Sequence, residues 1–383
     1  MMVYKGAQKL GDFFTSRRER GTPGLPMLSV TMNNGVVTRE SLDRKMETNL
    51  SDEEHLLVRK DDIVYNMMRM WQGASGLADR DGLLSPAYVV LAPKKGIDPL
   101  YASYLFKSSR LIYLLWAYSY GLTSDRLRLY FNDFKRIPVN IPSLPEQRKI
   151  GKILSTWDKA IDVTEKLIEK SKAQKSALMQ KLLTGNIRFQ VFSDEWRNVK
   201  LQDLAKVEMG SSPKSESYNA DGLGLPLIQG NADIKNGFSA PAFFTSQVTK
   251  ECFKGDILLS VRAPVGTVAR SDHHACIGRG IASIRAKKLT SQVFLYNWLL
   301  AYEGKWIRLS QGSTFEALNR NDLTSLHLTI PSYEEQQKIA QVLTAADREV
   351  EVLQQNLTCL KHEKKALMQQ LLTGKRRVKV DKS

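Results

Sequence analysis

At 383 residues, with 42% hydrophobic and 25% charged content, the chain has an ordinary soluble composition and room for two or three domains, each with its own core. The 56 Lys and Arg against 40 Asp and Glu give a net charge of +16, which attracts polyanions, most commonly nucleic acid. Three scattered cysteines exclude a disulfide framework and indicate a reducing, cytoplasmic location, and no signal peptide or membrane-length apolar run is seen.

The first predicted domain covers residues 1–142. A β-rich stretch follows Pro26, and the strand-like run 60–64 precedes a turn at Gly76. An apolar helical stretch over 101–118 is followed by the polar loop 119–129. This mixture of strands and helices predicts an α/β domain that carries polar loops.

A long helix is predicted next, over residues 143–185. Ser143 and Glu146 have the spacing of a capping box, and Gly185 is placed to adopt the left-handed conformation that ends a helix. Apolar residues between them recur at alternating steps of four and three, which is a heptad pattern. At 1.5 Å per residue the predicted rod is about 60 Å long.

The second predicted domain covers residues 186–331 and matches the first loosely. Residues 200–204 correspond to 9–13, and Lys-Gly-Asp-Ile-Leu at 254–258 corresponds to 60–64. An apolar helical stretch over 293–307 again precedes a polar loop that contains Gly and Ser. The framework therefore repeats while the loops differ, as expected of a duplicated protein that binds two different targets.

A second long helix is predicted over residues 332–374, and it repeats the first. Pro142 to Gly185 and Pro331 to Gly374 align without a gap at an offset of 189, with about nineteen of forty-four positions identical. Ser332 and Glu335 form the second capping box. The repeating unit is thus about half of the chain, and the predicted architecture consists of two copies of one domain followed by one long helix.

The narrow apolar seam of each helix demands a coiled-coil partner, and the economical partner is the other helix. The predicted fold class is α+β: two globular α/β domains separated by two long helices in an intramolecular antiparallel coiled coil, with pseudo-twofold symmetry. Lys175 and Lys364 also fall on the heptad positions. The predicted apolar seam residues are Ile150, Leu154, Trp157, Ile161, Ile168, Leu178, Leu182, Ile339, Leu343, Val350, Leu353, Leu357, Leu367 and Leu371.

Residues 375–383 form a basic tail. The second domain begins with a lead-in, 186–196, that has no counterpart before the first domain, and Lys375-Arg-Arg-Val378 aligns with the start of that lead-in. We therefore expect the tail to dock on the first domain and close the repeat into a circle. A solvated tail, or one that contacts phosphates, is the open alternative.

Catalytic motifs are missing from the sequence. There is no phosphate-binding loop with Gly-Lys-Ser/Thr and no methyl-donor motif. His273, His274 and Cys276 lack the paired spacing of a metal site, so no metal is predicted. The expectation is a binding subunit without cofactor and not an enzyme.

The twin Pro-Ser-x-x-Glu-Gln-x-Lys-Ile entries and the twin Leu-Met-Gln-x-Leu-Leu-Thr-Gly exits of the helices resemble the specificity subunit of type I restriction-modification systems. The Lys-Gly-Asp-Ile-Leu run at 254–258 and the Gln-Gly-Ser-Thr loop at 311–314 are also similar to the target recognition domains of that family. The first domain departs from this pattern, with Lys-Asp-Asp-Ile at 60–63 and Tyr-Gly-Leu-Thr at 120–123.

The resemblance implies that two target recognition domains read the two halves of a bipartite, asymmetric site in double-stranded DNA. The helices would hold the domains apart like a ruler. Two modification subunits, which use S-adenosylmethionine, and restriction subunits, which use ATP and Mg, are the implied partners. Methylation of adenine and DNA cleavage would belong to those partners.

Base edges are read by Arg, Lys, Asn, Gln, Ser and Thr side chains, because these carry the matching donors and acceptors. Any single candidate can instead be a surface residue or a phosphate contact, which positions the protein without specifying sequence. In the first domain the candidates are Asn33, Asn34, Arg39, Arg69, Trp71, Gln72, Thr123, Ser124, Arg126 and Arg128. In the second domain they are Gln229, Asn231, Lys235, Arg262, Arg279, Gln311, Ser313, Thr314 and Arg320.

Two other functions remain open. The chain can serve an orphan methyltransferase complex that has no restriction partner. It can also be a non-catalytic coiled-coil scaffold whose basic domains bind DNA by shape alone. The sequence does not give the DNA target, because base choice depends on loop geometry.

Overall fold

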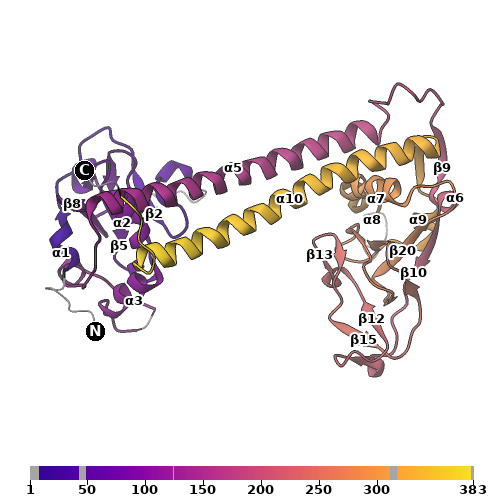
Figure 1. Ribbon diagram of the computed structural model, residues 1–383. Helices are drawn as coiled ribbons and strands as arrows, with labels where there is room; N and C mark the ends of the chain where they lie inside the picture. The colour runs from indigo at the N-terminus through magenta and orange to yellow at the C-terminus, as the bar shows by residue number, and fades with distance from the viewer. Residues whose placement is uncertain (1–7, 43–48, 124, 311–316, 381–383) are drawn as a thin grey trace. The chain divides into compact units, whose positions relative to one another are not determined.

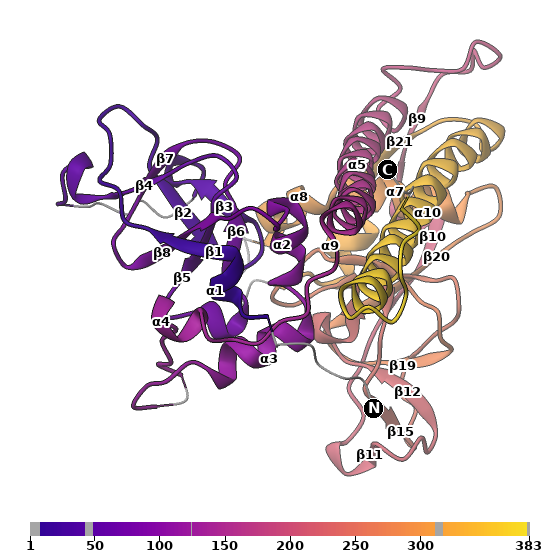
Figure 2. The ribbon, with the colours of Figure 1, turned by 60° about the vertical axis from the view of Figure 1, so that its left-hand side comes forward.

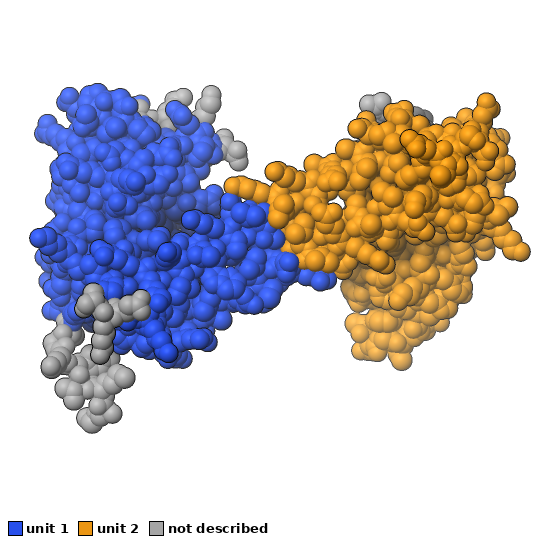
Figure 3. Space-filling view, turned by 45° about the horizontal axis from the view of Figure 1, so that its top comes forward, with its two compact units in different colours: residues 1–165, 355–383 blue, residues 166–354 orange. Residues whose placement is uncertain are grey.

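The computed structural model describes residues 8–42, 49–123, 125–310 and 317–380, with the side chains of 307–310 left out. The chain divides into two compact units, one of residues 1–165 with 355–383 and the other of residues 166–354 (Figure 3). Two long helices, α5 (Leu144–Leu182) and α10 (Tyr333–Leu372), contribute one end to each unit. Each unit also contains one globular domain (Figure 1).

The first domain is built on a four-stranded antiparallel sheet in the order β1-β8-β5-β6, with two-stranded pairs β2-β3 and β4-β7 beside it. Ile63, Val64 and Tyr65 in β5 are all fully buried, so this strand is covered on both faces. The strands are β1 Phe14–Arg17, β2 Leu28–Thr31, β3 Gly35–Thr38, β4 Leu56–Val58, β5 Ile63–Asn66, β6 Ser75–Leu77, β7 Gly82–Leu84 and β8 Tyr88–Pro93.

Short helices close the core of the first domain. Asp98 and Ser108 accept hydrogen bonds from backbone N–H groups and cap α2 and α3. The rings of Tyr65 and Phe134 stack at 5.6 Å, and this aromatic cluster continues into Ile150 and Leu154 of α5. The helices are α1 Leu10–Phe13, α2 Pro99–Leu105, α3 Ser109–Ala117 and α4 Phe131–Phe134, with 3-10 turns η1 Arg39–Ser41, η2 Asp52–Glu54 and η3 Met70–Gln72.

The second domain repeats this framework and adds to it. Its six-stranded sheet has the order β10-β20-β17-β18-β14-β13, and β10-β20-β17 corresponds to β1-β8-β5. A five-stranded sheet, β11-β15-β12-β19-β16, and the pair β21-β9 complete it (Figure 2). The strands are β9 Arg197–Lys200, β10 Ala205–Met209, β11 Tyr218–Asn219, β12 Leu225–Ile228, β13 Ile234–Lys235, β14 Phe238–Ser239, β15 Phe243–Thr245, β16 Glu251–Cys252, β17 Ile257–Ser260, β18 Val268–Arg270, β19 Ala275–Ile277, β20 Ile281–Ala286 and β21 His327–Ile330.

The core of the second domain includes Trp306, which is fully buried. Gly266 is required beside it, because a Cβ at this position would lie 2.5 Å from Trp306 Cβ and the φ of 97° favours glycine. The helices of this domain are α6 Leu201–Leu204, α7 Gln292–Ala301, α8 Glu303–Ser310 and α9 Arg320–Thr324, with 3-10 turns η4 Ser215–Ser217 and η5 Asn231–Asp233.

The long helices pack together in antiparallel fashion (Figures 1 and 2). In the first unit Lys361 of α10 pairs with Glu165 of α5 at 2.7 Å, and in the second unit Ser171 of α5 donates to Glu349 of α10 at 3.1 Å. Seven predicted seam residues are buried: Ile150, Leu154, Ile168, Leu182, Ile339, Leu343 and Leu371. The other seven are half-buried: Trp157, Ile161, Leu178, Val350, Leu353, Leu357 and Leu367. The predicted fold class, two mixed domains with two long paired helices, is confirmed.

The repeated Glu-Gln at the helix starts ties each helix to its surroundings. Gln147 accepts from the backbone N–H of Asp98 at 2.8 Å, and Gln336 accepts from that of Ser291 at 3.0 Å. Both amides are buried and join α5 to the cap of α2 and α10 to the cap of α7. The repeated motif thus fixes where each helix leaves its domain.

The neighbouring glutamates bind arginines that follow the far end of the other helix. Arg377 donates to Glu146 at 2.7 and 2.8 Å, and Arg188 donates to Glu335 at 2.7 and 3.0 Å. Bidentate contacts between an arginine and a carboxylate are strong and directional. The start of each long helix is therefore fastened to the end of the other.

No helix in the part of the chain that the structure describes is long and apolar enough to cross a membrane.

Candidate nucleic-acid interface

In the first domain one hydrogen bond brings two polar loops together. The backbone N–H of Leu129 donates to the carbonyl of Met67 at 2.9 Å, which lies directly after β5. The loop that carries Arg69, Trp71 and Gln72, which follows β5, is thereby held beside the loop 119–129, which follows α3.

These two loops enclose a hollow of about 920 Å³. Arg69, Gln72, Thr123, Arg126 and Arg128 are exposed and Trp71 is half-buried. Three charged guanidinium groups and flat aromatic rings in one hollow can contact both phosphates and bases. Six residues predicted from the sequence line it: Arg69, Trp71, Gln72, Thr123, Arg126 and Arg128. Ser124 lies outside the described residues.

Sequence reasoning missed two aromatic residues in this hollow. The rings of Tyr120 and Tyr130 lie 5.7 Å apart and both line the hollow. Partial desolvation raises the pKa of Tyr120 above its ordinary value, and the charge of Asp133 adds to the rise. The sequence signal that could have indicated Tyr120 is its position next to Gly121 in a polar loop.

A lysine ties the predicted Asn33 and Asn34 hairpin to the same region. The Nζ of Lys107 donates to the carbonyl of Gly73 at 2.6 Å and to that of Met32 at 3.3 Å. Burial lowers the pKa of Lys107. Asn33 and Asn34 are exposed at the tip between β2 and β3.

Arg39 does not line the hollow. It begins η1 and is half-buried, and its Nε is buried without a hydrogen-bond partner among the described residues.

The second domain uses the same connection at the same place. The backbone N–H of Leu318 donates to the carbonyl of Val261 at 2.9 Å, and Val261 follows β17 as Met67 follows β5. Arg262 comes next and is exposed. Arg320 begins α9 shortly after this connection and is exposed. Gln311, Ser313 and Thr314 lie outside the described residues.

Backbone hydrogen bonds place two further candidates beside Arg262. The N–H of Val261 donates to the carbonyl of Gly280 at 2.9 Å, and the N–H of Gly280 donates to that of Gln229 at 3.1 Å. Arg279 is exposed next to Gly280. Gln229, Arg262 and Arg279 therefore gather at one end of the central strands.

Asn231 and Lys235 lie farther along the same segment. Asn231 begins η5 and is half-buried, and its Oδ1 has no partner among the described residues. Lys235 is exposed at the β13–β14 hairpin, where Asn236 and Gly237 both have positive φ. This Asn-Gly turn corresponds in chemistry to the Asn33-Asn34 tip of the first domain.

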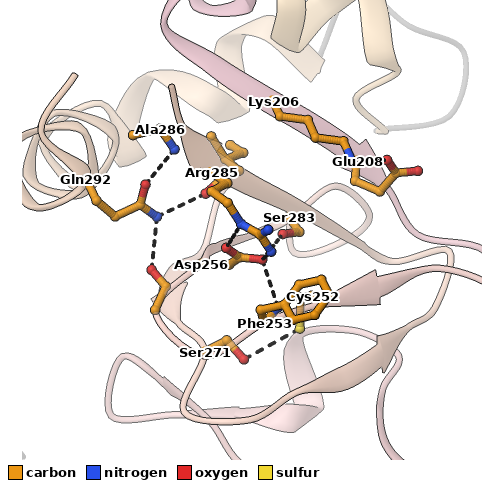
Figure 4. Close-up of polar contacts among 12 residues, drawn as sticks. Lys206, Glu208, Cys252, Phe253, Asp256, Ser271, Ser283, Arg285, Ala286 and Gln292 are labelled. Atoms are coloured by element: carbon orange, nitrogen blue, oxygen red, sulfur yellow. Dashed lines mark hydrogen bonds and ion pairs between the residues drawn. The ribbon is translucent and has the colours of Figure 1, made fainter. Parts of the chain in front are cut away.

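The aspartate of the Lys-Gly-Asp run makes polar contacts within its own domain (Figure 4). Asp256 accepts from Arg285 at 2.6 Å and from Ser283 at 2.9 Å, and Asp62 in the first domain accepts from Arg17 at 2.7 Å. The hydrogen bond to Asp256 raises the pKa of Arg285. Both aspartates are buried and their arginines are neutralised, so these two cations add little to the field of the loops.

The structure brings no set of metal ligands together in the described ranges, since no group of three or more His, Cys, Asp and Glu residues converges there. His273 instead hydrogen-bonds Ser239 through Nδ1 at 2.7 Å, and the ring of His274 stacks on Phe253 at 4.6 Å.

Two tandem domains with loops at matching places, joined by paired helices, define a duplicated recognition protein. The family model described as the type I restriction modification DNA specificity domain matches residues 7–172 and again 193–362. The chain belongs to this family, whose domain recognises DNA and is not catalytic.

Individual proteins agree with this assignment. The chain is 34% identical over 307 residues to a putative type I restriction enzyme specificity subunit of Methanocaldococcus jannaschii, covering 76% of this chain and 71% of the relative. One solved chain comes from a study of complex assembly and conformational transition of the type I R-M system. It is 24% identical to this chain, the match covers 95% of this chain and 96% of the solved chain, and the TM-score is 0.62. The S subunit from M. genitalium is 16% identical, with coverages of 97% and 98% and a TM-score of 0.61. The solved structures support the fold.

Proposed function

We propose that this chain is the specificity subunit of a type I restriction-modification complex and reads a bipartite, asymmetric DNA site with one domain per half-site. The observation that carries the proposal is the repeated hydrogen bond, Leu129 to Met67 and Leu318 to Val261, which holds the segment after the corresponding strands β5 and β17 at the same place in each domain. The framework is the same, whereas the loop residues differ. Two unlike half-sites are what such a pair would read.

The exposed and half-buried polar residues near these bonds have the chemistry that base reading requires. Arg69, Arg126 and Arg128 in the first domain can donate two hydrogen bonds to the O6 and N7 acceptors of guanine, and Gln72 can pair with adenine. Arg262, Arg279 and Gln229 offer the same groups in the second domain. The net charge of +16 adds phosphate attraction that depends on salt and not on sequence.

The paired helices serve as the spacer between half-sites. Half-sites one duplex turn apart have centres roughly 34–36 Å from each other on the same face of DNA. A helix of 39 or 40 residues is about 60 Å long, which is enough to hold two domains at that separation.

Reaction chemistry belongs to partner chains in this proposal. Two modification subunits supply S-adenosylmethionine-dependent adenine methylation, and restriction subunits supply cleavage driven by ATP and Mg. This chain needs no cofactor for recognition, and the complex acts in the cytoplasm.

The test is to map methylated adenines in cells that carry this chain with its genomic neighbours, and in cells from which its gene is deleted. We expect a motif of two short half-sites separated by unspecified bases, and its loss on deletion. An unchanged methylation pattern after deletion would favour the scaffold function instead.

A further inference from the structure

The glycines that end the two long helices share one backbone path. Gly185 and Gly374 have φ values of 73° and 72°. After Gly185, the N–H of Ile187 donates to the carbonyl of Lys181 at 3.2 Å. After Gly374, the N–H of Arg376 donates in the same way to the carbonyl of Gln370 at 3.1 Å. The surroundings of the two glycines can therefore be compared directly.

In the second domain an aromatic side chain covers the glycine that ends α5. A Cβ on Gly185 would lie 3.4 Å from Cζ2 of Trp196, and Trp196 packs against the second core. Asp194 and Glu195 directly precede it. The hydrogen bond to Glu335 raises the pKa of Arg188, and the charge of Asp194 adds to the rise. The segment that covers the second helix end is thus an aromatic residue preceded by acids.

In the first domain no described atom lies within 4 Å of a Cβ on Gly374. The glycine opens instead onto a groove of about 500 Å³. Arg110 and Arg376 are exposed at this groove, and neither is in an ion pair within the described ranges. Its apolar walls include Leu111, Leu114, Val139, Leu371 and Val378.

We propose that this groove binds an aromatic side chain of a partner protein, presented on a segment with acidic residues immediately before the aromatic. The segment Asp194-Glu195-Trp196 covers the corresponding place in the second domain and therefore indicates the chemistry that fits. An aromatic ring buries 150–250 Å² in an apolar groove, and carboxylates beside it form charge-assisted contacts with arginine. The same backbone geometry is present at Gly374, together with apolar walls and two arginines that form no ion pair within the described ranges.

The probe for this site is a fluorescent peptide with the sequence of residues 190–197, titrated into the full-length chain and followed by anisotropy. We expect saturable binding that weakens at least about tenfold when Trp196→Ala is made in the peptide, because truncating a buried aromatic anchor typically has this effect. The double change Arg110→Glu and Arg376→Glu in the chain weakens it similarly. The matched control is Arg148→Glu, an exposed arginine of α5 that does not line the groove, and it leaves the affinity unchanged.

A graft gives a second readout. Replacing residues 379–383 by the sequence of residues 190–196 places the aromatic segment in the same chain, after Val378. This variant is expected to abolish peptide binding and to melt at a higher temperature than the same graft carrying alanine for tryptophan.

Three results would overturn the assignment. One is equal binding of the alanine peptide, and another is a graft that neither blocks the peptide nor stabilises the domain. The third is a rise in peptide affinity when residues 1–7 are deleted, since that would assign the groove to this chain and not to a partner. None of these outcomes bears on DNA reading, because the groove residues are not part of the reading loops.

Discussion

Lys175 of α5 and Asp347 of α10 form an ion pair across the two long helices, with 2.5 Å between Nζ and Oδ1. Lys364 and Asp158 form the corresponding ion pair in the first unit. The two pairs are related by the repeat, since both the lysines and the aspartates are 189 positions apart in the sequence. Tyr104 also donates to Asp158 at 2.6 Å. Polar groups at seam positions fix which residues face each other in a coiled coil, so these pairs set the register of the antiparallel helices.

Asp347→Ala should therefore destabilise the protein. The side chain of Lys175 is only 17% exposed, and the change leaves its ammonium group without this carboxylate. We expect a loss of about 1–3 kcal/mol in the free energy of unfolding, measured by urea denaturation.

The control for this change is Glu169→Ala, at an exposed site on the paired helix α5, which should stay within about 0.5 kcal/mol of wild type. The double variant Lys175→Met with Asp347→Leu should recover most of the loss, because it replaces both partners with apolar groups. Equal losses in Asp347→Ala and Glu169→Ala would contradict the register function.

The contact of Arg377 with Glu146 makes the first domain sensitive to acid. The hydrogen bond from Arg377 holds the pKa of Glu146 below its ordinary value of 4.5. A carboxylate with a lowered pKa stabilises the fold above its unfolded pKa, and this contribution is lost as pH falls through the folded value. Arg377→Met should thus lower the melting temperature at pH 7.

The same variant should melt close to wild type at pH values well below 4.5, because Glu146 is then protonated in both proteins. Differential scanning calorimetry across this range gives the comparison. A melting difference that does not depend on pH would show that Arg377 acts through packing alone.

The tail after α10 should stabilise the first domain. Val378 packs against the first core, and Lys149 donates to the carbonyl of Lys379. Deleting residues 375–383 should speed proteolysis within residues 8–142, measured by limited digestion and mass spectrometry. A chain that lacks only 381–383 keeps these contacts and is the control, and equal protease resistance of the two would exclude docking of the tail.

The paired helices and the duplicated framework could be predicted because their signals are local and repeated. Heptad spacing around Leu154 and Leu343 indicates a seam, and Gly185 and Gly374 mark the helix ends. The hydrogen bond between Leu129 and Met67 could not be predicted, since it joins residues far apart in the sequence. The hollow with Tyr120 and Tyr130 depends on that bond, and so does the grouping of the first-domain candidates. The sequence identified Asp62 and Asp256 only as part of a motif shared with the family. Their contacts with Arg17 and Arg285 could not be predicted, because these arginines lie on other strands.

Helix length should set the spacing of the recognised half-sites. Inserting one heptad into both α5 and α10, at the same distance from the seam lysines, preserves the seam and lengthens each helix by about 10 Å. Methylation mapping should then give a motif with unchanged half-sites and a longer spacer. An unmoved motif would mean that the helices do not measure the spacing.

The most direct test of one domain per half-site compares methylation motifs in cells that carry wild type, Arg69→Ala or Arg262→Ala. Both arginines are exposed at corresponding loops of the two domains. The account predicts that Arg69→Ala relaxes base choice in one half-site only and that Arg262→Ala relaxes it in the other half-site only. Relaxation of the same half-site by both changes, or of both half-sites by either, would contradict it.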